Sequence, residues 1–403
     1  MADQGLAGKM IWSLDYDVKG ERSLLSAMYD TMEQKPSKSI KNIMPTIGAI
    51  RWDAWYKPLS EKNSEGYNGP AMAMTRSMGP EKYHYRLPFF ASVSSVDKIS
   101  INGYTQEVVD REIAYARAGG LDYWAFLLYD ENSGMSQGLK FYLSSIKKKD
   151  MHFCVISYPS LFGNSTRLQH EMQRVIKLIS EPTYQKVMGN RPLVYLLMDP
   201  NSDGYAKALL TEPDARKWCD NFREEIKKAG KGDPYIVICD YDPVQGNKFK
   251  DILGADAISA YAWAYSPGGI TPYKAQVESS NGYWNSMLAT GANIIPNVTS
   301  GWDRRPRIEQ PVPWETYQKP GVGLDDYVAM PTPQELADNI HEAMQFCRDN
   351  QPKCPAQTVL IYAWNEHDEG GYLCPTLKVD GSADTSRLDA IALMLRNWKS
   401  NIK

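Results

Sequence analysis

Short runs of apolar residues recur along the chain, and runs of this kind predict buried β-strands. They lie at residues 47–56, 123–129, 152–158, 193–198, 235–240, 257–263, 293–298 and 358–364. Between most of these runs, apolar residues at three- and four-residue spacing predict helices at residues 106–117, 166–179, 213–229 and 333–348. Strands that alternate with helices in this number predict an α/β fold of the (β/α)8 TIM-barrel type.

The connections between these elements define the rest of the expected organisation. Some connections, notably residues 240–255, look short or irregular, so a doubly wound sheet is an alternative that the pattern leaves open. A short apolar run at 87–91 falls in the long stretch after the first strand, and we interpret it as an insertion in a long loop. We expect residues 1–40 to form an N-terminal extension packed on the barrel and residues 41–403 to form the barrel domain.

The composition narrows the classes of ligand. The chain has 45 basic and 48 acidic residues, and this balance gives no electrostatic reason to expect a nucleic-acid partner. No apolar run reaches about 18 residues, so no membrane-spanning segment is expected. Tryptophan and tyrosine number 11 and 25 against 9 phenylalanines. Amphipathic rings suit polar, ring-shaped ligands, and sugars are the foremost candidates.

Motifs for other chemistries are not found in the sequence. No glycine-rich nucleotide motif follows a strand, so no cofactor is expected. The five histidines and six cysteines lack metal-binding spacing, and we expect no metal, with His367 beside several acids as the alternative metal ligand. Cys347 and Cys354 bracket a loop that a disulfide would close in an oxidising compartment. The N-terminus lacks the features of a signal peptide. We expect a periplasmic or secreted protein whose export signal is absent from this chain, and a cytoplasmic protein is the alternative.

Polar and aromatic residues follow nearly every predicted strand. Because a barrel places its active site at the C-terminal ends of its strands, we predict that these side chains open onto one cavity. Their aromatic members, above all the tryptophans after the first, sixth and seventh strands, would stack on a sugar ring. The predicted substrate-binding residues are Arg51, Trp52, Asp53, Asp130, Tyr158, Asp240, Tyr261, Trp263, Asn297, Trp302, Asp303 and His367.

The last predicted strand runs directly into an acidic cluster. Residues 359–364 are apolar, and Glu366 and Glu369 follow, with Gly370 and Gly371 behind them. Three residues apart on a continued strand, the two glutamates would point to opposite faces, but a turn that the glycines permit would bring both into one cavity. Two carboxyl groups that share a cavity push their pKa values apart, which supplies a proton donor and a base at the same pH. We therefore expect Glu366 and Glu369 to be the catalytic pair.

The same residues carry a resemblance to known families. The run Ala363-Trp364-Asn365-Glu366-x-x-Glu369-Gly370, followed by Leu373 and Pro375, resembles a signature of the WbsX-like family and of glycoside hydrolase family 99. Weaker matches occur, in the same order as in these families, at residues 47–52, 120–124 and 296–298, at Trp302-Asp303 and at Arg307. Both families are (β/α)8 barrels that act on glycans.

The resemblance implies a reaction and a role for each glutamate. Glu366 would act as the base, in family 99 toward the 2-hydroxyl of the sugar, and Glu369 would protonate the leaving oxygen and later activate water. His367 replaces the family tryptophan, and Cys374 stands where the WbsX-like pattern has glutamate, so the mannose preference of family 99 is not expected to carry over. We expect hydrolysis of a polysaccharide or oligosaccharide. A glycosyltransferase and a non-catalytic glycan-binding protein are the alternatives.

Overall fold

The computed structural model describes residues 44–402, apart from 57–68, 97, 159–165, 199–203, 266 and 316–317. The expected N-terminal extension, residues 1–40, lies outside the described residues. The described part is built around one sheet of parallel strands. These strands are β1 (Thr46–Arg51), β4 (Tyr123–Leu127), β5 (His152–Ser157), β7 (Arg191–Leu197), β8 (Tyr235–Cys239), β9 (Ala257–Ser259), β11 (Asn297–Thr299) and β13 (Thr358–Tyr362).

The strands curve into a barrel. Neighbours pair in the order β11-β13-β1-β4-β5-β7-β8-β9, and every pair in this path is parallel. The two ends of the path meet through a parallel bridge between Ile258 of β9 and Ile294, just before β11. The fold is therefore a (β/α)8 TIM-type barrel, as the sequence predicts, and this closure excludes the doubly wound sheet.

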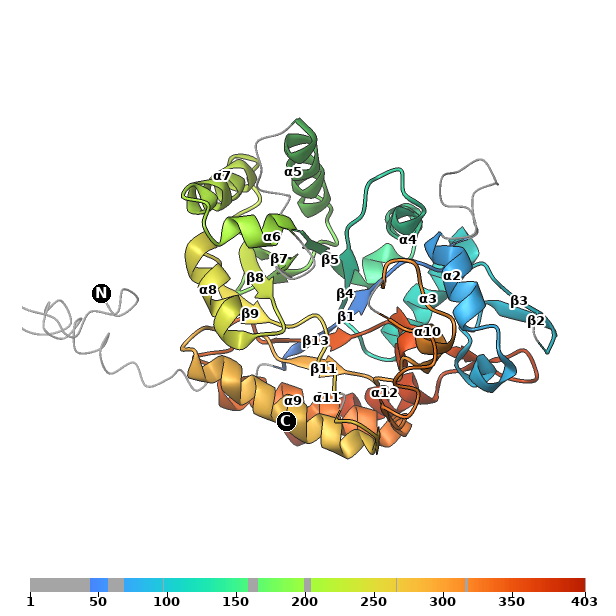
Figure 1. Ribbon diagram of the computed structural model, residues 1–403. Helices are drawn as coiled ribbons and strands as arrows, with labels where there is room; N and C mark the ends of the chain where they lie inside the picture. The colour runs from blue at the N-terminus through green and yellow to red at the C-terminus, as the bar shows by residue number, and fades with distance from the viewer. Residues whose placement is uncertain are drawn as a thin grey trace, which may run out of the picture. The chain divides into compact units, whose positions relative to one another are not determined.

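Helices surround the strands. They are α2 (Pro70–Ser77), α3 (Gln106–Ala118), α4 (Gln137–Ser144), α5 (Thr166–Ile179), α6 (Gly204–Leu209), α7 (Ala215–Lys228), α8 (Pro243–Leu253), α9 (Tyr273–Ala289), α10 (Arg305–Glu309), α11 (Pro333–Asp349) and α12 (Ser386–Ile402). Helices α9, α11 and α12 pack together on one side of the strands, and α5, α7 and α8 lie on another (Figure 1). Among the described residues, no helix has the length and apolar character needed to cross a bilayer.

Helix α8 occupies the stretch that the sequence pattern misses. Asp242 caps its first turn by accepting from the backbone N–H groups of Val244 and Gln245, and Pro243 starts it. Gly254 ends it with φ of 66°. The start and stop signals are therefore present in the sequence, although the apolar periodicity between them is weak.

The run at residues 87–91 lies outside the barrel sheet, in agreement with its interpretation as part of an insertion. Its last residue begins β2 (Ala91–Ser95), which forms an antiparallel hairpin with β3 (Lys98–Ile101). Other short strands lie around the barrel. These are β6 (Lys186–Val187), β10 (Ile270–Thr271), β12 (Tyr327–Val328), β14 (Asn365–Glu366), β15 (Gly371–Tyr372), β16 (Thr376–Leu377) and β17 (Ala383–Asp384).

At Gly48 of β1, the interior of the barrel is filled by a side chain from a neighbouring strand. The ring of Tyr123 lies where a side chain at Gly48 would begin, with Cζ only 2.0 Å from an ideal Cβ, so this position requires glycine. The Tyr123 hydroxyl in turn lies 3.0 Å from the hydroxyls of Tyr195 and Thr358. These contacts join strands β4, β7 and β13 across the barrel.

A buried ionic network attaches β1 to α3. Arg51 is fully buried, and its Nη2 donates to Oε2 of Glu112 at 2.8 Å while its Nε donates to Oδ1 of Asp53 at 2.8 Å. The indole N–H of Trp364 donates to the other oxygen of Glu112 at 2.9 Å. Glu112 therefore ties the first strand to the segment that follows the last strand. The thiols of Cys347 and Cys354, in contrast, are buried and free.

We expect Glu112→Leu to lower the free energy of unfolding by about 3–5 kcal/mol, because it leaves the buried guanidinium of Arg51 and the indole N–H of Trp364 without this partner. The measurement is equilibrium urea unfolding. The matched control is Glu278→Leu on α9, where the carboxylate is exposed and 3.9 Å from Lys274, with an expected change within about 0.5 kcal/mol. Equal losses in the two variants would contradict the role of the network.

Candidate active site

A cavity of about 720 Å³ opens at the C-terminal ends of the barrel strands. Residues at or after the ends of all the barrel strands except β5 contribute to its wall. The lining is mainly aromatic and apolar, and the charged side chains in it form one cluster of ion pairs. The lining residues are Trp52, Pro70, Leu127, Tyr129, Met135, Leu197, Tyr241, Tyr261, Ala262, Ala264, Trp302, Arg304, Arg307, Trp314, Glu315, Tyr362, Glu366 and Glu369.

Glu366 and Glu369 enter this cavity from one tight turn. Glu366 ends β14, and the 3-10 helix η8 (His367–Glu369) follows it directly. Gly370 then reverses the chain with φ of 78°. A side chain at Gly370 would meet the backbone N of Asp303 at 3.0 Å, so both the backbone angle and the space favour glycine. The turn therefore places two carboxyl groups, three residues apart, in one cavity.

Arg307, on α10, lies at the centre of the acidic groups. Its Nη1 donates to Glu369 at 2.6 Å and to Glu315 at 3.0 Å, and its Nη2 donates to Glu366 at 3.3 Å. Its Nε donates to Asp368. A buried arginine can balance only one of the four carboxylates, so the cluster keeps protons or needs a further cation.

Arg304 supplies the second positive charge, and it favours Glu369. Its Nε donates to Oε1 of Glu369 at 3.0 Å, and its Nη2 donates to Glu315. The hydroxyl of Tyr362 donates to the other oxygen of Glu369. Glu366 receives less help, because beyond its longer contact with Arg307 it accepts a hydrogen bond from the Tyr261 hydroxyl at 3.1 Å.

These contacts drive the two glutamate pKa values apart. Burial and the neighbouring Glu369 carboxylate raise the pKa of Glu366 well above its ordinary value. Burial also acts to raise the pKa of Glu369, but Arg307, Arg304 and the Tyr362 hydroxyl outweigh it and hold that pKa below its ordinary value. Of the two carboxyl groups, Glu366 therefore holds its proton more strongly and Glu369 ionises more readily. This order is the reverse of the one that the family resemblance implies.

Five residues predicted from the sequence line this cavity. They are the two glutamates together with Trp52, Tyr261 and Trp302. Trp52 is held by its indole N–H, which donates to the hydroxyl of Tyr129 at 2.8 Å, and its ring lies 5.1 Å from the guanidinium of Arg307. Trp302 packs against Tyr362 at 5.7 Å between ring centroids.

Four other predicted residues do not line the cavity, because their side chains form buried contacts behind its wall. Arg51 and Asp53 pair with each other in the buried network that attaches β1 to α3. Asp303 forms ion pairs with Arg86 and Arg305. His367 is fully buried, stacks on Tyr372 and donates from Nδ1 to the carbonyl of Arg86 at 2.8 Å. Burial lowers the pKa of His367 to about 3, so it is neutral.

The remaining predicted residues also lie outside the cavity lining. Trp263 stacks on Tyr283 with ring centroids 4.2 Å apart, so one ring face is already covered. Asp240 accepts from the backbone of Asp242, and Asp130 accepts from the backbone of Asn132, so each shapes its own loop.

Tyr158 is partly buried and contacts Tyr129 instead of the cavity. Asn297 is fully buried in the barrel, and neither of its side-chain amide atoms has a partner among the described residues. The positions of these residues outside the lining share a reason. A position after a strand can be read from the sequence, but the direction of its side chain depends on the local turn.

Several lining residues were not among those predicted from the sequence. Arg307 had a signal, because it follows Trp302-Asp303 in the family-like pattern, and Tyr362 lies in the last predicted strand. Trp314 and Glu315 had none, because they lie in a long excursion after α10 that no strand pattern marks. Within the described residues, no group of three or more His, Cys, Asp or Glu side chains is arranged to hold a metal ion.

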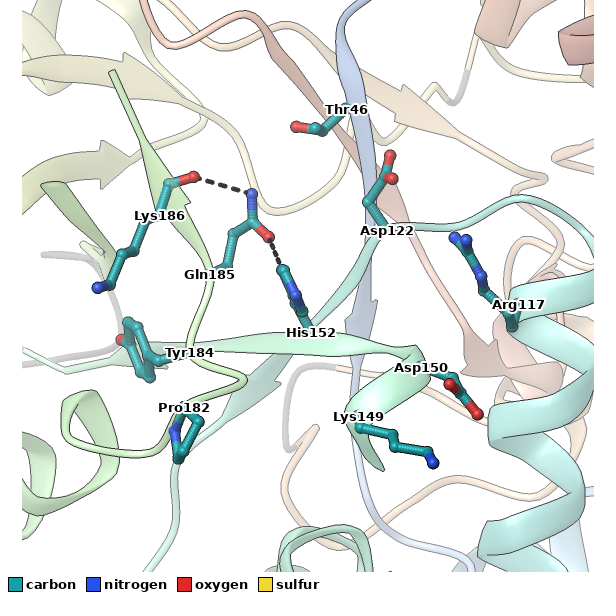
Figure 2. Close-up of a pocket in the computed structure, with 10 residues that line it drawn as sticks. All are labelled: Thr46, Arg117, Asp122, Lys149, Asp150, His152, Pro182, Tyr184, Gln185 and Lys186. Atoms are coloured by element: carbon teal, nitrogen blue, oxygen red, sulfur yellow. Dashed lines mark hydrogen bonds between the residues drawn. The ribbon is translucent and has the colours of Figure 1, made fainter. Parts of the chain in front are cut away.

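A second cavity, of about 590 Å³, opens at the opposite ends of the strands. Figure 2 shows its lining, in which Thr46, Asp122 and His152 mark the starts of β1, β4 and β5, and His152 is joined to Gln185. Asp122 is engaged in the fold, because it accepts from the backbone N–H of Ile47 at 2.7 Å. Groups at this end of a barrel ordinarily serve stability, so the first cavity is the better candidate for an active site.

Comparison with solved structures finds the same fold in a glycoside hydrolase family 99 endo-α-mannosidase from Bacteroides thetaiotaomicron. Its complex with bis-tris-propane gives a TM-score of 0.53 at 14% sequence identity, over 88% of this chain and 97% of that one. A further structure of a family 99 endo-α-mannosidase from this organism gives a TM-score of 0.51 at the same identity and coverage. No protein-family model and no curated protein matches the chain. The chain therefore shares the fold of these family 99 structures, and membership of the WbsX-like family finds no support here.

The ion pairs of Arg304 lead to a prediction about stability and pH. A carboxyl group whose pKa is depressed by folding stabilises the protein above its unfolded pKa, about 4.3 for glutamate, and that stabilisation is lost as the pH falls through the folded pKa. Because Arg304 helps to depress the pKa of Glu369, Arg304→Gln should cost about 2 kcal/mol of unfolding free energy near neutral pH. The deficit should shrink as the pH falls below about 4. Urea unfolding across this range is the measurement, and a deficit that stays constant or grows at low pH would contradict the assignment.

Proposed function

We propose that this protein is a glycoside hydrolase that cleaves a glycosidic bond in a polysaccharide or oligosaccharide, with Glu366 and Glu369 as its acid/base pair. The observation that carries the proposal is the pair itself, two carboxyl groups with pKa values driven apart inside one aromatic cavity. The family 99-like fold supports it, since the solved structures with this fold are glycosidases.

The directions of the two pKa shifts suggest a division of labour. Glu366 has the raised pKa, so it is the better group to protonate the bridging oxygen as the bond from the anomeric carbon to that oxygen breaks. Glu369 has the lowered pKa, so it is the better group to accept a proton from the attacking water or to stabilise positive charge at the anomeric carbon. Tyr261 and Tyr362 orient the two carboxyl groups through their hydroxyls.

The lining of the cavity favours a neutral sugar. Both arginines that line it, Arg304 and Arg307, already hold carboxylates of the protein. Trp52, Trp302 and Trp314 instead offer ring surface, which packs against the C–H faces of a sugar. The proposal does not extend to mannose, because His367 and Cys374 depart from the family pattern.

A glycan-binding protein without catalysis is the weaker reading of the same cavity. Two buried carboxyl groups in contact with the same arginine repel each other, and binding alone gains nothing from that cost. Catalysis gains from this repulsion, because it needs both a proton donor and a base at one pH.

We expect the purified protein to release products from at least one neutral glycan in a panel of plant, algal and host polysaccharides, read by mass spectrometry. Glu366→Gln and Glu369→Gln should each lower turnover by about 100-fold or more, because glutamine keeps the shape and loses the titratable proton. Glu278→Gln on α9, an exposed glutamate, is the matched control and should keep full activity. Full activity in either site variant would refute the pair.

The division of labour has its own test. An aryl glycoside has a leaving group that needs little protonation, so it should rescue the variant that has lost the acid and not the one that has lost the base. From the directions of the pKa shifts we expect rescue of Glu366→Gln. The measurement is the ratio of kcat/KM on aryl and natural substrates for each variant. Rescue of Glu369→Gln instead would restore the order implied by the family resemblance, and equal losses on both substrates would refute any division.

A further inference from the structure

Two aromatic side chains stand out at the mouth of the cavity because they are exposed. Among the described residues, the aromatic side chains with high exposure are Tyr85 at 51%, Tyr241 at 45% and Trp314 at 40%. Of these three, Tyr241 and Trp314 line the cavity that holds the glutamate pair. Large exposed rings are unfavourable in water unless a ligand or partner covers them.

The two rings belong to opposite sides of the barrel. Trp314 packs edge-on against Trp52, the residue after β1, with ring centroids 5.8 Å apart and an interplanar angle of 62°. Tyr241 is the second residue after the end of β8. In the barrel order β1 is separated from β8 by β4, β5 and β7 in one direction and by β13, β11 and β9 in the other. The rings therefore flank the mouth from opposite sides.

Trp314 is attached to the catalytic cluster. Its neighbour Glu315 accepts hydrogen bonds from Arg304 and Arg307, which also hold Glu369. The guanidinium of Arg307 lies 5.9 Å from the Trp314 ring centroid. The ring is thus placed relative to the reacting groups by ionic contacts as well as by packing.

Tyr241 stands on an ordered turn. The backbone N–H of Asp242 donates to Oδ1 of Asp240 at 2.9 Å, and the Asp242 side chain caps α8 through the N–H of Val244 at 2.8 Å. The turn therefore presents the ring from a backbone that is fixed on both sides. A ring held in this way loses little conformational entropy when a ligand stacks on it.

We propose that Trp314 and Tyr241 are two stacking platforms that bind two different sugar rings of one chain, so that the substrate spans the mouth of the barrel. The proposal rests on the proposed function and adds to it the shape of the substrate. Rings on opposite sides of the mouth are poorly placed to clamp one sugar, whereas an oligosaccharide that crosses the cavity covers both. A monosaccharide derivative would leave at least one platform exposed.

The test is binding as a function of chain length. The probes are ladders of neutral manno-, xylo- and gluco-oligosaccharides from disaccharide to octasaccharide, and calorimetry uses the inactive Glu366→Gln/Glu369→Gln protein to prevent cleavage. In that background, Trp314→Ala and Tyr241→Ala should each weaken binding of the longest bound chains by about 10-fold or more, the effect of truncating an aromatic anchor. The combined variant should multiply the two losses, because the sites are separate.

Chain length distinguishes two platforms from one. Each alanine variant should have no effect on chains too short to reach its ring, and the chain length at which the loss begins should differ between the two variants. Trp314→Phe and Tyr241→Phe keep a ring and should bind within about threefold of the parent protein. Losses that are the same at every length, or no loss in either variant, would overturn the proposal while leaving the hydrolase proposal intact. A wild-type protein that neither binds nor cleaves any glycan would overturn both.

Discussion

The buried guanidinium of Arg307 is the interaction on which the candidate site depends. It contacts Glu315, Glu366, Asp368 and Glu369, which reach it from two segments of the chain. A charge removed from water in this way is tolerated only when it is paired and hydrogen-bonded, and a cluster with more carboxylates than cations must retain protons. The same constraint that holds the turn after β13 against α10 therefore also gives the site its chemistry. Arg307 and, after it, Arg304 favour the ionised form of Glu369, because Arg307 lies closer to Glu369 than to Glu366 and Arg304 also pairs with Glu369.

The barrel supports this cluster with a buried set of ion pairs. Arg51, Asp53 and Glu112 close the space behind the site, and Trp364 links them to the strand that carries the glutamates. Side chains that seemed from their position to be ligand-binding groups thus act as the support for those that do line the cavity. A site held from behind by buried ion pairs keeps its geometry when water or ligand moves through it, which is what acid/base chemistry requires.

The surface of the cavity complements its charges. Acidic groups pair with the two arginines of the wall, and tyrosine and tryptophan rings occupy much of the remaining wall. Such a surface has little to offer an ionic ligand and much to offer a polar molecule with flat apolar faces. The structure shows where the many aromatic residues lie. Some rings fill the barrel, as Tyr123 does, and others, as Trp314 does, face the opening.

The sequence by itself determined the barrel and the position of its acidic turn. Buried parallel strands read as continuous apolar runs, and Glu366 and Glu369 lie next to one with glycines behind them, so both features are local and visible along the chain. Only the tertiary structure decided which strand-end residues face the cavity. Asp303 pairs with Arg86, which is far away in the sequence, and Trp263 stacks on Tyr283, which lies in a helix. It also decided in which direction the pKa of each glutamate is shifted. A pKa depends on distances to groups such as Arg304, and those distances exist only after distant segments of the chain have folded together.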